Sequence, residues 1–187
     1  MKTHNSNTRF IALASIILIA AFSRLIPHPY NFTPIAAMAL FGGAYFTNKK
    51  WAFAIPLLAM FVSDVSLAFI NNFMLFDVMR LVVYGCFIII TCLGLLLQNK
   101  IKPLSIIGTS LVGSILFFAV TNFAVWATGL TYPMNSTGLI ACYTAALPFF
   151  QNTLLGDLIY CGVLFGSFEF AKQKFPVLAG TNKIVVV

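Results

Sequence analysis

Three polar residues interrupt otherwise apolar stretches of this 187-residue chain: Asp64, Asn122 and Asp157. Charged and amide groups are costly inside apolar helices, and where they occur they usually bind ligands, relay protons or pair with one another. Counting helical rise from the nearest end of each apolar run places Asp64 roughly 9 Å and Asp157 roughly 12 Å below the same surface. We therefore take these three residues as the first candidates for a binding site.

Further side chains lie at helical spacing from these candidates and therefore on the same faces of the predicted helices. Trp126 follows Asn122 by four residues, and Tyr160 follows Asp157 by three. Because small-molecule sites combine apolar and aromatic walls with a few polar groups, the sequence predicts a ligand pocket. Its predicted ligand-binding residues are Asp64, Arg80, Asn122, Trp126, Asp157, Tyr160, Asn152 and Tyr132.

The segment 27–33 (PHPYNFT) is predicted to form a lid over this pocket. Its two prolines oppose a helix. Non-helical backbone at membrane depth is tolerated only where protein or a cavity satisfies its polar groups. The predicted lid residues are His28, Tyr30, Asn31 and Phe32.

A structural role is the alternative for the same polar residues. Asp64 could pair with Arg80 only to join two helices, and Arg24 could extend to the membrane surface. The aromatic residues could form a belt at the membrane interface.

Signatures of common catalytic sites are missing from the sequence. It contains no HExxH, GxSxG or P-loop pattern, and neither Asp64 nor Asp157 stands in a protease motif. The four cysteines lie within apolar runs and lack the spacing of a zinc site. We therefore expect no enzyme, no cofactor and no metal site.

The composition of the chain is typical of a membrane protein. Hydrophobic residues make up 60% of the sequence and charged residues 8%, and the mean hydropathy is +0.97. A soluble domain of this length could not bury so much apolar surface, so lipid is the expected solvent. The predicted fold is an all-α polytopic membrane protein, a single membrane domain over residues 1–187. Its six transmembrane helices are expected at about 10–26, 34–46, 51–70, 78–97, 104–128 and 149–171.

The second predicted helix, 34–46, is short and rich in small residues. It would cover roughly 20 Å, less than the ~30 Å hydrocarbon core. Thr33 is placed to cap it. Ala39 and Gly43 form a small-xxx-small pair that permits close helix contact, either within the chain or with a partner subunit. The segment 138–147 is too short to span a bilayer and is predicted to be re-entrant or interfacial.

Basic residues are distributed unevenly between the predicted loops. Arg24 and Arg80 fall on one side. The other nine fall on the opposite side: Lys2, Arg9, Lys49, Lys50, Lys100, Lys102, Lys172, Lys174 and Lys183. Basic loops stay in the cytoplasm, so both termini are predicted to be inside (N-in, C-in), in a multi-pass protein of the cell (inner) membrane. The net charge of +7 then favours contact with membrane lipid, and we expect no nucleic acid as a partner.

Four strings resemble an uncharacterised bacterial membrane family described as putative transport protein: PHPYNFTP at 27–34, SD at 63–64, TNFAVW at 121–126 and LGDL at 155–158. The six-helix architecture with an outward pocket under a first-loop lid also resembles the substrate-binding S components of energy-coupling factor vitamin transporters. That resemblance implies capture of a vitamin-like micronutrient and docking to a coupling subunit with ATPases.

S components dock through an Ala-xxx-Ala pair on the first helix. In this chain, Ala12 and Ala14 each lack an alanine four residues later. Docking through Ala39 and Gly43, or action as a solitary carrier, therefore stays open.

Three functions remain open on the sequence. The first is a substrate-binding S-component-like subunit or small carrier that captures a micronutrient, a small-molecule substrate, from the outer side. The second is a proton- or ion-coupled transporter that uses Asp64 and Asp157. The third is a structural or assembly membrane protein whose polar residues only hold helices together.

Overall fold

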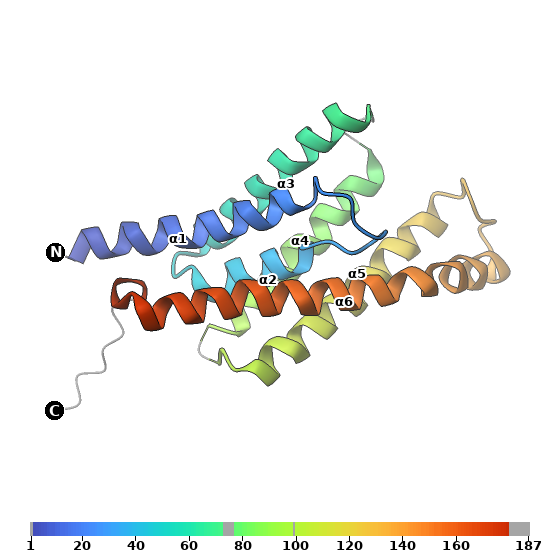
Figure 1. Cartoon of the computed structure of the whole chain (residues 1–187). Helices are drawn as coiled ribbons and strands as arrows, with labels where there is room; N and C mark the ends of the chain where they lie inside the picture. Colours follow the sequence, from blue (N-terminus) through green and yellow to red (C-terminus); the bar gives the residue numbers. More distant parts are fainter. Residues whose placement is uncertain (1, 73–76, 99, 180–187) are drawn as a thin grey trace.

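The computed structural model describes residues 2–72, 77–98 and 100–179 and places six α-helices in them (Figure 1). Helices α3 to α6 are each long and apolar enough to cross a membrane, and α1 and α2 contribute shorter apolar helices. The chain is therefore an all-α, multi-pass membrane protein. The elements are α1 (Lys2–Ser23), α2 (Ile35–Tyr45), α3 (Lys49–Asn71), α4 (Val78–Leu96), α5 (Pro103–Ala127), α6 (Ser136–Lys174) and the short 3-10 helix η1 (Pro176–Ala179).

Helix α2 forms the centre of the bundle and contacts the other five helices (Figure 1). Every one of its residues is buried, and its sequence, IAAMALFGGAY, is apolar on all sides. A helix without a polar face is stable only when other elements surround it. The core of the protein therefore lies around α2.

Ala39 and Gly43 are both buried in this core. Gly43 lies against the backbone of α4, in contact with Thr91 and Gly94. A Cβ built on Gly43 would lie only 2.8 Å from Gly94 Cα. Ala39 and Gly43 thus pack helices together within this chain. Neither is exposed to a partner subunit, because the rest of the chain surrounds α2 on all sides.

The helices alternate in direction, so the connections gather at two ends of the bundle (Figure 1). The start of α1, the end of α6 and the α2–α3 and α4–α5 connections share one end. There Tyr45 Oη donates to Glu169 Oε1 (2.5 Å), and Gln98 donates to the Gly43 carbonyl (2.9 Å). We call this the lysine-rich end because it holds Lys49, Lys50, Lys100, Lys102, Lys172 and Lys174. Lys183, which was predicted to lie on the same side, falls outside the described residues.

Helix α6 corrects the prediction for the segment before the sixth helix. Residues 138–147 do not form a segment separate from the sixth helix, because α6 runs from Ser136 through Pro148 to Lys174. Asn135 caps the start of α6 by accepting a hydrogen bond from the Gly138 N–H (2.8 Å). A proline removes one backbone donor, but packing against neighbouring helices allows an apolar helix to continue through it. With 39 residues, the helix is longer than the roughly 20 residues that a bilayer requires.

Two helix boundaries near the lid also differ from the prediction. Helix α1 ends at Ser23, and residues 24–26 continue in tight turns whose N–H groups bond three residues back. Pro34 stands in the cap position of α2, and no side chain caps that helix, so the expectation for Thr33 was wrong. Thr33 instead lines the cavity described below.

Candidate functional site

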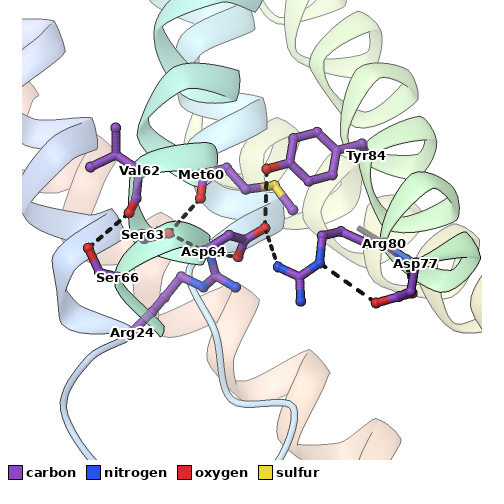
Figure 2. Close-up of polar contacts among 9 residues, drawn as sticks. All are labelled: Arg24, Met60, Val62, Ser63, Asp64, Ser66, Asp77, Arg80 and Tyr84. Carbon is purple, nitrogen blue, oxygen red and sulfur yellow. Dashed lines mark hydrogen bonds and ion pairs between the residues drawn. The ribbon is translucent and has the colours of Figure 1, made fainter. Parts of the chain in front are cut away.

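Asp64 of α3 binds two arginines at the end of the bundle opposite the lysine-rich end (Figure 2). Its Oδ1 lies 2.8 Å from Arg24 Nη1, and its Oδ2 lies 3.1 Å from Arg80 Nη1. Tyr84 Oη donates to the same Oδ2 at 3.1 Å. The Asp64 side chain is only 4% exposed, so a buried carboxylate has charged or hydrogen-bonding partners on both oxygens. We call Asp64, Arg24, Arg80 and Tyr84 the ion-pair cluster.

Helix ends bring the members of the ion-pair cluster together. Arg24 directly follows α1, and its Nη1 also donates to Ser63 Oγ (2.5 Å). Arg80 lies in the first turn of α4, where its backbone N–H donates to the capping residue Asp77 (2.8 Å). The second oxygen of Asp77 lies 3.8 Å from Arg80 Nε. Arg24 therefore points to acceptors on α3, and the alternative of an arginine that extends to the membrane surface was wrong.

Asp157 of α6 lies apart from the ion-pair cluster. It is 3% exposed, and its Oδ2 accepts a hydrogen bond from Ser114 Oγ of α5 (2.6 Å). In the ranges that the structure describes, no basic side chain pairs with Asp157. A carboxylate buried among apolar helices without a cationic partner is unfavourable unless something else compensates for its lost hydration.

A cavity of about 300 Å³ connects the ion-pair cluster with Asp157. Its volume lies at the lower limit of the ~300–1,000 Å³ of small-molecule sites. It combines five charged side chains with apolar ones, as such sites require. The residues that line it are Arg24, Asn31, Thr33, Ile35, Ala36, Met60, Asp64, Leu67, Asp77, Met79, Arg80, Val83, Phe117, Thr153 and Asp157.

The connection between α1 and α2 lines one side of this cavity through Asn31 and Thr33. Asn31 lines the cavity and has a positive φ of 63°, a conformation that asparagine tolerates better than most residues. The Tyr30 carbonyl accepts a hydrogen bond from Asn152 of α6 (2.9 Å). The Phe32 ring packs on Tyr160, also of α6, with centroids 5.8 Å apart. The lid is therefore fastened to α6.

His28 and the Tyr30 ring take no part in the cavity lining. The His28 ring contacts the neighbouring Pro29 carbonyl (3.0 Å), and the Tyr30 side chain is 81% exposed. Its ring packs against Phe149 on the outside of the bundle. Of the four predicted lid residues, only Asn31 touches the cavity directly.

Replacing Gly156 with leucine is expected to lift the lid. A Cβ at this position would lie 3.2 Å from both Phe32 Cα and Thr33 N, so a larger side chain must displace lid backbone. We expect Gly156→Leu to lower the free energy of unfolding in detergent by about 1–3 kcal/mol. Chemical denaturation of the purified variant measures this change.

Gly162 is the matched control, because it lies on the same helix and a Cβ there meets nothing within 4 Å. Gly162→Leu should be neutral or should stabilise the protein by up to about 1 kcal/mol through helix propensity. Equal losses in the two leucine variants would show that the lid does not rest on Gly156.

Five of the eight predicted ligand-binding residues lie outside the cavity lining. Asn122 donates to the Phe118 carbonyl within its own helix (2.8 Å), and Trp126 Nε1 donates to the Pro133 carbonyl (3.1 Å). The early turns of α6 pack against this end of α5, where Cys142 contacts the Asn122 carbonyl. The Asn122 side chain thus bonds its own helix, and the Trp126 side chain bonds the α5–α6 connection. The remaining three are Tyr132, Asn152 and Tyr160. Tyr132 lies in the α5–α6 connection, Asn152 forms a hydrogen bond with the lid, and Tyr160 forms one with the end of α1.

Asp64, Arg80 and Asp157 are the predicted residues that the structure brings together around the cavity. Sequence reasoning left out Arg24 and Ser114. A single serine in an apolar run carries little signal by itself. Arg24 carries a stronger signal, because Arg24 and Arg80 are the two basic residues predicted to lie on the side opposite the lysines. Among the described residues, no group of three His, Cys, Asp or Glu side chains is placed to hold a metal ion.

Comparison with known proteins assigns the chain to a family. The model of a family of unknown function, DUF6580, matches residues 4–178. The chain belongs to that family. Neither a curated protein nor a solved structure matches the chain. The match covers the six helices apart from the first two residues of α1, and with them the ion-pair cluster, Asp157 and the lid.

Proposed function

We propose that this DUF6580 protein captures a small molecule from the outer side of a cell membrane and takes part in its uptake. In this proposal it acts as a substrate-binding subunit that resembles the S components of vitamin transporters, or as a small carrier. The observation that carries the proposal is the cavity of about 300 Å³ under the lid, where the buried Asp157 carboxylate, which no basic side chain of the described residues pairs with, faces an apolar wall. A protein that used its polar residues only for helix packing would have no need of that arrangement.

The proposed orientation places the lysine-rich end in the cytoplasm, with both termini inside and six crossings of the inner membrane. The positive-inside rule supports this choice, because lysine side chains gather at one end and the cavity lies toward the other. The cavity would then open to the outside, and anionic lipid would contact the lysines. The hydrogen bond between Tyr45 and Glu169 would help to close the cytoplasmic end.

A coupling subunit with ATPases remains part of the proposal, but its contact surface changes. Because α2 is enclosed, such a subunit would have to bind the outer faces of the other helices. Ala39 and Gly43, buried within α2, cannot form that contact in this structure.

Ion-coupled transport is the second candidate, and it would use the two buried aspartates, Asp64 and Asp157. Asp64 is bound by two arginines and a tyrosine. Asp157 has no such cations beside it in the part of the chain that the structure describes. Uptake that collapses with the proton gradient in the wild type, and becomes independent of it in Asp157→Asn, would favour this candidate.

Native mass spectrometry of gently extracted protein tests capture. We expect the wild type to retain a small molecule, because a ligand enclosed by the lid dissociates slowly. Asp157→Asn should reduce the retained fraction by at least about tenfold, since about 1.4 kcal/mol of binding free energy corresponds to that factor. Asn122→Ala is the control, because Asn122 does not line the cavity.

Two results would contradict capture. One is the absence of a retained molecule together with unchanged growth and uptake on a range of micronutrients when the gene is deleted. The other is equal retention in wild type and Asp157→Asn, which would place the bound molecule elsewhere. If Asp64→Asn and Asp157→Asn lower only thermal stability, the structural or assembly role is the better description.

A further inference from the structure

The formal charges of the residues that line the cavity do not sum to zero. Two arginines face three aspartates there, which leaves one negative charge in excess if all five are ionised. The ion pairs show where that excess lies. Asp64 binds Arg24 and Arg80, and Asp77 lies 3.8 Å from Arg80, so both arginines already have carboxylate partners. When Asp157 is ionised, the excess charge is its own, because no basic side chain of the described residues pairs with it.

An anionic ligand fits this distribution poorly. To bind either arginine directly, it would have to compete with Asp64, whose contacts at 2.8 and 3.1 Å are those of close charge pairs. It would also meet the unneutralised Asp157 across a small cavity. Like charges at short range in a poorly hydrated space repel strongly.

A positive group fits the same distribution well. Asp157 is 3% exposed and is held in place by the Ser114 hydroxyl, so its orientation is fixed before any ligand arrives. The ring of Phe117 and the apolar side chains of Met60, Leu67 and Val83 offer a wall for a hydrocarbon or ring portion. A metal ion would find too few ligands, because no cluster of three metal-binding side chains occurs among the described residues.

We propose that the molecule captured in this cavity is a small organic cation, whose protonated amine or equivalent group binds the Asp157 carboxylate. This inference rests on the proposed function and narrows its substrate class. The apolar body of the ligand would lie against Phe117 and its neighbours, and the ion-pair cluster would form the opposite wall without supplying the main charge contact.

Three probes of the same size and different charge test the substrate class: benzylamine, benzyl alcohol and benzoate, each added to detergent-purified full-length protein at neutral pH. Thermal unfolding against probe concentration gives the apparent affinity of each. We expect benzylamine to bind the wild type about tenfold more tightly than benzyl alcohol, and benzoate to bind least. In Asp157→Asn, the difference between benzylamine and benzyl alcohol should disappear.

Glu169→Gln is the matched control, because it makes the same change of carboxylate to amide on the same helix at the lysine-rich end. It should keep the preference for benzylamine. A wild type that prefers benzyl alcohol or benzoate overturns the inference, as does a preference for benzylamine that survives in Asp157→Asn.

The retained molecule separates this inference from the proposed function. If native mass spectrometry and fragmentation identify a retained molecule without a basic group, the inference fails and capture stands. If no molecule is retained and none of the three probes stabilises the protein, capture and the inference fail together.

Discussion

Replacing Asp64 with alanine is expected to lower the free energy of unfolding by about 3–5 kcal/mol, the range for removing one partner of a buried charge cluster. The substitution removes the carboxylate that Arg24 and Arg80 share, and both arginine side chains are largely buried, at 11% and 19% exposure. This carboxylate joins α3 to α4, through Arg80 and Tyr84, and to Arg24, the residue that follows α1. Chemical denaturation in detergent, followed by tryptophan fluorescence, measures the loss.

A triple variant provides the control for Asp64. Replacing Asp64 with leucine and both arginines with methionine removes all three charges together, and buried ion pairs exchanged for apolar residues are often neutral or stabilising. We expect the triple variant to regain most of the stability lost in Asp64→Ala. If Asp64→Ala costs less than about 1 kcal/mol, the cluster behaves like an exposed salt bridge, and its burial would have to be reconsidered.

Gly43→Ala is expected to destabilise the protein by about 3 kcal/mol, although the same change usually stabilises a helix. In a helix interior, alanine is normally favoured over glycine by roughly 0.5–1 kcal/mol. At Gly43 the added Cβ would overlap the Thr91 carbonyl and lie 2.8 Å from Gly94 Cα. The obstacle is backbone, which cannot rotate away as a side chain can, so α2 and α4 must separate. Because α2 is the centre of the core, the loss extends to the contacts around it.

Gly85 gives the control for this prediction. It lies on α4, and a Cβ built there meets nothing within 4 Å. Gly85→Ala should leave stability unchanged or raise it slightly, so the two alanine substitutions should differ in sign. Thermal unfolding of both purified variants decides the matter. Equal effects would mean that α2 and α4 do not approach as closely as the structure has them.

The residue pattern predicts some features of these helices and leaves others open. Apolar runs long enough for a bilayer are visible in the chain itself, and four of the six predicted helices agree with the structure to within a few residues at both ends. Helices α1 and α6 begin well before their predicted starts. The sequence also marked Ala39 and Gly43 as small residues suited to close packing. It could not tell whether their partner lay in this chain or another, because small residues serve both purposes.

The residues of the candidate site could also be predicted from the sequence only in part. Asp64 and Asp157 stand out because a charge in an apolar run is costly wherever the run folds. Asn122 and Trp126 share a helical spacing, yet neither lines the cavity. The Asn122 amide bonds the Phe118 carbonyl of its own helix, and the Trp126 indole bonds the Pro133 carbonyl of the α5–α6 connection. Spacing along one helix could not show which side of it the rest of the chain would leave open.

By itself, the sequence determined that the chain is apolar enough for a multi-pass membrane protein, that six helices form in the described residues and that the lysines among them gather at one end. These properties follow from local hydropathy and charge, which each segment carries independently of the others. Only the tertiary structure decided that Arg24 and Arg80 bind Asp64 and that no basic side chain of the described residues pairs with Asp157. Ion pairs join residues far apart in the chain, and which of them meet depends on how the helices pack around α2.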